Sequence, residues 1–289
     1  GCRGRTFGLQ SRVMRRSFLS IVAVCLVAML GACVAAPKSA TAPNSPPKRV
    51  ERVLFVGNSL TYRNDLPAHF AALASTALGA TVEAEMIAAG GARIEQHAAQ
   101  GLVQTELASG RYTVLVLQEW GSGLLCDPEF AKFGFECAAS HRAHRELVEV
   151  ARRNRVRVVL LGTYSSAPEP AIALADAEAE LASSLGITHA DLRDLPELRG
   201  ARPADEWFDT DGHHPGPELT LLMARRLADA LHGDMPLPRA VEMQYRDYRG
   251  EQAPKLQLLA SAQNLQPAQR TRRVEPSDWE RLARAGRAP

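Results

Sequence analysis

The 289-residue sequence lacks several features that would assign it to a class at once. It contains no internal repeat, and no pair of its five cysteines has the CxxC spacing of a zinc site. Its one long apolar run, residues 17–32, is too short to cross a bilayer comfortably. What remains is a chain with 46% apolar residues, which is enough to bury a sizeable core.

Charge is distributed unevenly along the chain. Residues 1–33 contain five arginines and no acidic residue, and residues 246–289 contain nine basic and five acidic side chains. Because the formal net charge of the whole chain is +2, the middle part, residues 34–245, is net acidic. An acidic surface repels phosphate backbones, so nucleic acid is not an expected partner. The arginine-rich stretch at 270–273 predicts a solvated, partly disordered arm.

Residues 1–33 have the pattern of an export signal. A basic stretch at 14–16 precedes the apolar run, which ends in small residues before Cys33. The sequence LGAC at 30–33 resembles the lipobox of bacterial lipoproteins, which implies cleavage before Cys33 and a lipid on its thiol. The expected location is therefore the bacterial cell envelope, with a lipid anchor in the membrane and the protein facing the periplasm or the exterior. Residues 1–13 are interpreted as a mis-called start, and a short buried helix or a plain membrane anchor is the alternative for the apolar run.

Residues 34–49 are rich in proline, alanine and serine and predict an extended tether. We expect a folded domain at 50–235 and a C-terminal extension, partly disordered, at 236–289. The cysteines that remain after the signal and Cys33 are Cys126 and Cys137. In an exported protein such a pair predicts a disulfide, with two free buried thiols as the alternative.

Apolar runs typical of strands alternate with helical patterns along the predicted domain. Strands are expected at 52–57, 81–88, 113–118, 156–162 and 187–190. Helices are expected at 66–78, 94–107, 141–154, 171–185 and 217–231, with a weak helix near 278–285. This alternation predicts an α/β fold in which a parallel sheet carries helices on both faces.

Ser59 follows the first expected strand within the sequence GNSLT, residues 57–61. In open parallel sheets, ligands bind at the carboxyl ends of the strands, where this serine is expected. Serine and asparagine are also preferred helix N-caps, so position alone leaves a capping role equally open. A nucleophilic serine needs a base and a group that orients the base.

The candidate base lies in the sequence DGHHP, residues 211–215, before the last helix. Asp211 precedes His214 by three residues, a spacing that lets the carboxylate accept the imidazole N–H. Asp209 and His213 are an alternative pair, although no acidic residue lies three positions before His213. These four side chains could instead bind a divalent metal, but no further cluster with ligand spacing supports that interpretation.

GNSLT and DGHHP are similar to the first and last motif blocks of the SGNH (GDSL-type) hydrolase family. The resemblance covers residues 53–231. It implies a three-layer α/β/α fold with a flavodoxin-like parallel sheet, a serine esterase activity, and neither a metal nor an organic cofactor. No G-x-S-x-G elbow surrounds Ser59, which argues against the α/β-hydrolase fold.

Carried over to this chain, the resemblance makes Ser59 the nucleophile, His214 the base and Asp211 the residue that orients it. The oxyanion would be bound by the N–H groups of Ser59 and Gly91, the latter in the glycine block AAGGARIEQH.

The third oxyanion donor is less conventional. The family usually carries an asparagine in the block that TVLVLQEWGSG occupies here, whereas this strand ends in Gln118. The longer amide of Gln118 is the candidate donor. Four further residues are candidates for substrate binding, each with a structural role as the alternative: Asn58, Glu119, Trp120 and His97.

The predicted function is hydrolysis of carboxylic esters with short acyl or acetyl groups, on small molecules or on carbohydrates. Two alternatives remain open from the sequence. One is a non-catalytic, ligand-binding lipoprotein with the same fold, and the other is a lipase or thioesterase for longer acyl chains.

Overall fold

The computed structural model describes residues 50–121, 123–165, 168–199, 207–248, 257–258 and 267–284. All of them belong to one compact unit, Pro46–Pro289. The predicted export signal, the lipidated Cys33 and the tether lie outside the described residues. Among the described helices, none combines the length and the apolar character needed to cross a membrane.

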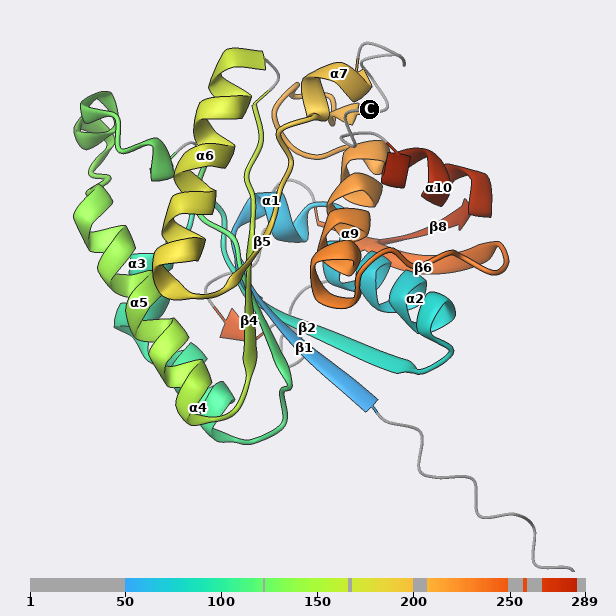
Figure 1. Ribbon diagram of the computed structural model, residues 1–289, viewed down its shortest axis with the longest axis horizontal. Coiled ribbons are helices and arrows are strands. Elements are labelled where there is room, and N and C mark those ends of the chain that lie inside the picture. The colour runs from blue at the N-terminus through green and yellow to red at the C-terminus, as the bar shows by residue number, and fades with distance from the viewer. Residues whose placement is uncertain are drawn as a thin grey trace, which may run out of the picture. The chain divides into compact units, whose positions relative to one another are not determined.

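Six strands form the main sheet in the order β5-β4-β3-β1-β2-β7 (Figure 1). The first five are mutually parallel, and β7 pairs with β2 in the antiparallel sense. The parallel order, 2-1-3-4-5, is that of the flavodoxin-like sheet, so the predicted fold is confirmed. The strands are β1 Val50–Gly57, β2 Thr81–Ala88, β3 Val114–Leu117, β4 Arg157–Leu161, β5 Thr188–Ala190 and β7 Gln257–Leu258.

Helices cover both faces of this sheet (Figure 1). Alternate residues of β1 divide between the faces: Val53 and Phe55 pack with one helical layer, and Leu54 and Val56 pack with the other. All four residues of β3 are buried, as a strand covered on both faces requires. The first layer contains α2 Leu66–Leu78 and α9 Pro217–His232, and the second contains α3 Ile94–Gln100, α4 Leu102–Ala108, α5 Cys137–Arg153 and α6 Pro168–Leu185.

Several short elements connect these layers. They are α1 Ser59–Tyr62, the 3-10 turns η1 Gly123–Leu125 and η2 Pro128–Phe133, and α7 Leu195–Arg199.

The single helix predicted at 94–107 is wrong, because the chain forms two helices there. Gly101 has a φ of 77°, ends α3 and begins α4. Its N–H donates to the carbonyl of Ala98, which closes the last turn of α3. Glycine adopts this left-handed conformation without the steric cost that a side chain would bring. The apolar periodicity continues across the break, which is why the sequence alone suggested one helix.

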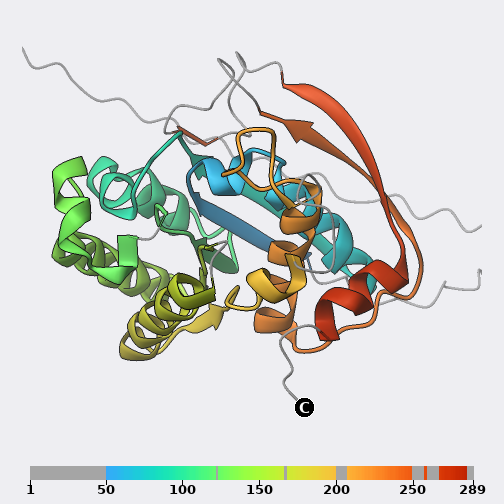
Figure 2. The same cartoon turned by 90° about the horizontal axis from the view of Figure 1, so that it is seen from above.

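The C-terminal part adds a second, two-stranded sheet that the sequence pattern did not predict. β6 Val241–Asp247 pairs with β8 Ala268–Val274 in the antiparallel sense, and α10 Pro276–Arg284 follows. These elements lie along the outer side of α2 and α9 (Figure 2). Residues 249–256, 259–266 and 285–289 lie outside the described residues, so the partial disorder expected for the extension stays a prediction.

One expectation for this region needs correction. Residues 270–273 were expected in a solvated arm, but they belong to β8, and the side chain of Arg272 is only 15% exposed. Arg272 forms an ion pair with Glu218 of α9 at 2.7 Å, and Arg281 of α10 pairs with the same carboxylate at 2.7 Å. The indole of Trp279 is fully buried and donates to the carbonyl of Met235 at 2.9 Å. The described parts of the extension, β6, β8 and α10, therefore pack against the folded domain.

Candidate active site

Ser59 lies where β1 ends, at the first position of the short helix α1. Asn58 caps this helix, and its side-chain oxygen accepts the N–H of Leu60 at 3.0 Å. The preceding residue has to be glycine, because a Cβ atom on Gly57 would lie 2.4 Å from the Thr61 hydroxyl oxygen. The sequence GNSLT is thus a tight strand-to-helix turn that presents Ser59 at the carboxyl edge of the sheet.

Asp211 and His214 are paired on the loop that precedes α9. The Asp211 Oδ2 atom lies 2.6 Å from Nδ1 of the His214 ring. The other carboxylate oxygen, Oδ1, accepts the backbone N–H groups of His213 and His214, each at 2.9 Å. The spacing in the sequence therefore brings together the pair that it predicted.

These contacts decide the charge of Asp211. Desolvation acts to raise its pKa, but the hydrogen bonds from the backbone of His214 and His213 and from the His214 ring outweigh it. The pKa of Asp211 is held well below its usual value. An ionised carboxylate on Nδ1 fixes the imidazole tautomer and leaves Nε2 as the ring nitrogen that can take a proton.

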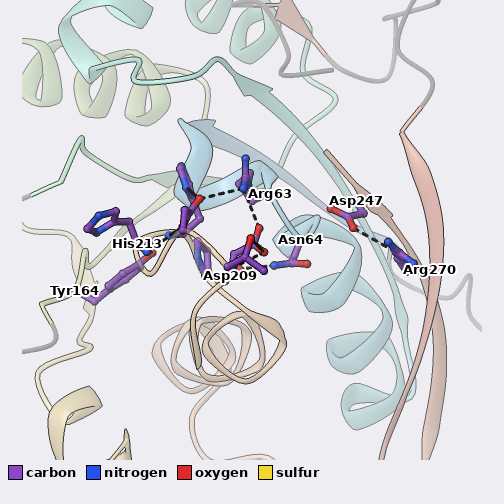
Figure 3. Close-up of polar contacts among 11 residues, drawn as sticks. Arg63, Asn64, Tyr164, Asp209, His213, Asp247 and Arg270 are labelled. Carbon is purple, nitrogen blue, oxygen red and sulfur yellow. Dashed lines mark hydrogen bonds and ion pairs between the residues drawn. The ribbon is translucent and has the colours of Figure 1, made fainter. Parts of the chain in front are cut away.

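Asp209 takes part in a different contact from the one that the alternative pairing would require. Its Oδ2 atom lies 2.9 Å from a guanidinium nitrogen of Arg63, which also lies 3.1 Å from Oδ2 of Asp211 (Figure 3). The backbone oxygen of His213 accepts the hydroxyl of Tyr164 at 2.8 Å. Arg63 thus supplies the cation beside the two carboxylates that were considered as metal ligands.

The glycine block forms a turn between β2 and α3. The N–H of Ala92 donates to the carbonyl of Ala89, and Gly91, which is exposed, has a φ of 65°. The side-chain amide of Asn58 donates to the carbonyl of Ala92 at 3.2 Å and to that of Glu119 at 3.1 Å. Asn58 is 1% exposed and joins the carboxyl ends of β1, β2 and β3. These hydrogen bonds hold the segments that form the site in place.

Gln118 is also buried and engaged within the protein. Its side-chain oxygen accepts the hydroxyl of Thr61 at 3.0 Å, and its amide nitrogen donates to the carbonyl of Glu119. These contacts favour a structural role under α1. The expectation that Gln118 also donates to an oxyanion stays a prediction.

Two other candidates for substrate binding have buried polar side chains. Glu119 accepts the N–H of Ile94 at 3.2 Å, the N–H of Trp120 at 2.7 Å and the hydroxyl of Ser140. The Nε2 atom of His97 lies 2.8 Å from the carbonyl oxygen of Gly57. Burial lowers the pKa of His97, which favours its neutral form. Glu119 thus joins the end of β3 to α3 and α5, and His97 joins α3 to the end of β1.

Trp120 lies closer to the surface than these residues. Its ring stacks on Phe135 with a centroid separation of 6.1 Å. The two aromatic rings connect the end of β3 to the segment before α5. A role for Trp120 in substrate binding stays a prediction.

A pocket of about 320 Å³ lies at the same edge of the sheet. It combines a residue next to Ser59, residues beyond β3 and β4, and residues of the loop that carries His214. Its lining consists of Leu60, Gly121, Tyr164, Ser165, Phe208, Gly212 and His213. A larger pocket of about 550 Å³ lies at the opposite edge around Val50, far from these residues.

Arg63 and the lining residues Tyr164 and Phe208 were not among the site residues predicted from the sequence. Tyr164 follows β4 at the carboxyl edge, a position that could have marked it as a site residue. Arg63 lies only four residues after Ser59, but its partners Asp209 and Asp211 are almost 150 positions away in the sequence. Nothing local indicates such a contact.

Cys126 and Cys137 form a disulfide with a Cα–Cα distance of 5.1 Å, so that prediction is confirmed. The Nε2 atom of His141 lies 3.6 Å from the Cys137 sulfur. Within the described parts of the chain, these three residues are the one group with ligand atoms close enough to hold a metal ion. Metals bind thiolates, whereas both sulfurs here belong to the disulfide.

Comparison with known proteins adds information about the fold. No family model matches the chain, and no curated protein matches it. Among solved structures, the acetyl-xylooligosaccharide esterase Axe2 from Geobacillus stearothermophilus is 10% identical, with a TM-score of 0.52 over 64% of this chain and 95% of that one. LAE5, an alpha/beta hydrolase enzyme from the metagenome of Lake Arreo, Spain, is 13% identical, with a TM-score of 0.50 over 63% of this chain and 95% of that one. The chain shares with these two proteins a three-layer α/β/α fold.

Proposed function

We propose that the protein is a serine esterase that hydrolyses carboxylic esters through an acyl-enzyme. The observation that carries the proposal is the hydrogen bond between Asp211 and His214. The loop that holds this pair is bound to Arg63, the residue that follows α1. Ser59, which begins α1, is then the nucleophile, His214 the base and Asp211 the residue that orients it. Two motifs about 150 residues apart thus contribute to one edge of the sheet.

In the first half-reaction, Ser59 Oγ attacks the ester carbonyl carbon and His214 Nε2 takes the hydroxyl proton. The N–H groups of Ser59 and Gly91 are the proposed donors to the oxyanion of the tetrahedral intermediate. When the intermediate collapses, the C–O bond to the leaving group breaks and His214 gives its proton to the departing alcohol. In the second half-reaction, water attacks the acyl-enzyme with the same base and releases the carboxylic acid and free Ser59.

The proposed substrates carry short acyl groups. The pocket of about 320 Å³ is bounded by Tyr164 and Phe208, whose rings lie 5.9 Å apart between centroids. Axe2, which has the same fold, is described as an acetyl-xylooligosaccharide esterase, so acetylated xylooligosaccharides are suitable first carbohydrate substrates. A series of p-nitrophenyl esters of increasing length tests the preference, because each methylene that fits a pocket stabilises binding by about 0.8 kcal/mol. A steady rise in kcat/KM up to long chains would replace this proposal with a lipase or thioesterase.

Hydrolysis of p-nitrophenyl acetate by active-site variants tests the mechanism. Ser59→Ala and His214→Ala should each lower kcat by about four orders of magnitude or more, with the circular dichroism spectrum unchanged. Ser109→Ala is the matched control, because Ser109 is exposed at the end of α4 and its hydroxyl contacts the backbone of Glu106 and Arg111. Retained activity in either active-site variant would contradict the proposal.

A fluorophosphonate probe separates this function from the non-catalytic alternative. Labelling of the wild-type protein at Ser59 supports the esterase. Absence of labelling, together with tight binding of a glycan, supports a ligand-binding protein that has lost turnover.

The sequence motif at Cys33 supports a second proposal, that the protein is lipid-anchored in the bacterial cell envelope. Incorporation of labelled palmitate should depend on Cys33. Equal incorporation in a Cys33→Ser variant would exclude this anchor.

A further inference from the structure

The segment after Ser59 contains a second group of polar residues that the proposed mechanism does not use. Tyr62 ends α1 and Leu66 begins α2, and Arg63, Asn64 and Asp65 lie between them. Both Asn64 and Asp65 are buried, and the Arg63 side chain is only 16% exposed. Buried polar side chains in a connection between two helices require partners, and these partners lie on the loop before α9 and on β6.

Arg63 binds the proposed catalytic pair directly. Its guanidinium nitrogen lies 3.1 Å from Oδ2 of Asp211, the same oxygen that lies 2.6 Å from Nδ1 of His214. The guanidinium also lies 2.9 Å from Asp209, whose side chain is 3% exposed. One arginine therefore bridges a buried carboxylate and the carboxylate that orients the base (Figure 3).

Asn64 binds the other end of the same loop. Its side-chain amide donates to the carbonyl of Pro215, the residue that follows His214. The loop is thus held on both sides of His214, by Arg63 through Asp209 and Asp211 and by Asn64 through Pro215. On the opposite side, the hydroxyl of Tyr164 donates to the backbone oxygen of His213.

The segment that binds the loop is itself fixed. The carboxylate of Asp65 accepts the backbone N–H groups of Ala68 at 3.4 Å and Arg246 at 3.0 Å. The N–H of Tyr248 donates to the carbonyl of Arg63 at 3.1 Å. The backbone of Arg63 is therefore held by the start of α2 and by the end of the β6 region.

From these contacts we propose that Arg63 is a positioning residue for the Asp211–His214 pair. It fixes the position of the pair and partly offsets the negative charge of Asp211, and Asn64 fixes the end of the loop. The proposal rests on the proposed function. Arg63 lies four residues after Ser59, at the end of α1. Its ion pairs therefore connect the helix that begins with the proposed nucleophile to the loop that carries the base. Displacement of a catalytic group by 1 Å can lower the rate about 100-fold.

The arginine also acts through its charge. It partly neutralises Asp211, which otherwise stabilises the protonated form of His214. Asp209 in turn partly neutralises Arg63. Tyr164 also faces this pair, and burial and the charge of Asp211 raise its pKa well above its usual value, so it stays neutral in the working range.

Removing either charge should therefore move the titration of His214, in opposite directions. Arg63→Met should shift the acid limb of the kcat/KM profile to higher pH, because Asp211 then stabilises the protonated ring more strongly. Asp209→Asn should shift it to lower pH. A merely structural role would not produce shifts of opposite sign.

The experiment measures p-nitrophenyl acetate hydrolysis from pH 5 to 9 in both variants, in Arg63→Lys and in the control Arg193→Met. We expect Arg63→Met to lower kcat about 100-fold with less change in KM, and Arg63→Lys to recover part of the loss. Arg193 pairs with exposed Asp176 and half-buried Asp191, away from the site, so its variant should behave as wild type.

The ring-proton NMR titration of His214 gives a readout that does not depend on activity. If wild type shows no Ser59-dependent hydrolysis but His214 shifts as described, the esterase proposal fails and the positioning role stands. If wild type is active and both shifts are absent, the positioning role is overturned. Should Arg63→Met fail to fold, Asp209→Asn decides, and an unchanged His214 titration there overturns the proposal.

Discussion

His69 of α2 makes the stability of the fold depend on pH. The side chain is 1% exposed beneath β6, and its ring lies 4.5 Å from that of Tyr245. The Nδ1 atom lies 3.2 Å from the carbonyl oxygen of Asp65, the acceptor one turn earlier in the helix. Desolvation lowers the pKa of His69 from 6.5 to about 4, and the positive charge of Arg272 adds to this effect.

The direction of the change in stability follows from the pH at which the folded and the unfolded state each take up the proton. The unfolded chain protonates His69 near pH 6.5, whereas the folded protein does so only near pH 4. The stabilising contribution is therefore complete above pH 6.5 and is lost as the pH falls from 6.5 to 4. At 1.36 kcal/mol per pKa unit, the full contribution is about 3 kcal/mol, of which about 2 kcal/mol is lost between pH 7 and pH 5.

Urea unfolding of wild type and His69→Asn at pH 7, 6 and 5 measures this contribution. Asparagine keeps a donor near the position of Nδ1 but cannot take up a proton, and its smaller size lowers the stability at every pH by a constant amount. The free energy of unfolding of wild type should fall by about 2 kcal/mol more than that of the variant from pH 7 to pH 5. Burial raises the pKa of Asp65, which acts in the opposite sense but is common to both proteins. Parallel pH dependences would refute the reasoning.

Two further predictions concern parts of the fold away from the site. Trp279→Ala should lower the free energy of unfolding by about 3–5 kcal/mol, because the fully buried indole leaves a cavity, and urea titration measures it. A change below about 1 kcal/mol would show that α10 is not part of the cooperative core. Replacing Cys126 and Cys137 by serine should lower it by about 3 kcal/mol, since their sequence separation of 11 closes a short loop. Equal stability of reduced wild type and oxidised wild type would contradict this.

The sequence predicts the main sheet and its helices well where local signals agree. The helix at 66–78 and the strand at 81–88 are observed with the predicted bounds, because Gly79 ends the helix and the strand follows after two residues. The second sheet could not be predicted in the same way. All but two residues of β8 are exposed, so β8 has no apolar pattern of its own in the sequence. The strand forms because it pairs with β6.

In the candidate site, too, local contacts can be predicted from the sequence and long-range contacts cannot. The Asp211–His214 contact spans three residues, and a local spacing is enough to predict it. The direction of the Gln118 amide depends on Thr61, which belongs to another element, so the sequence could not indicate that this amide is already engaged. The contact of Arg63 with Asp209 depends on the whole fold for the same reason.

The burial of Trp279 has a consequence for synthesis of the chain. The apolar outer side of α9 is covered by α10, whose indole donates to a carbonyl 44 positions earlier. At about 5–20 residues per second, a ribosome needs roughly 2–9 s to add that length of chain. A chain that has formed the parallel strands and α9 but lacks α10 leaves uncovered the surface of α9 against which α10 packs. Completion of folding therefore waits for α10, and a chain that lacks it offers an apolar surface that chaperones or other nascent chains can bind.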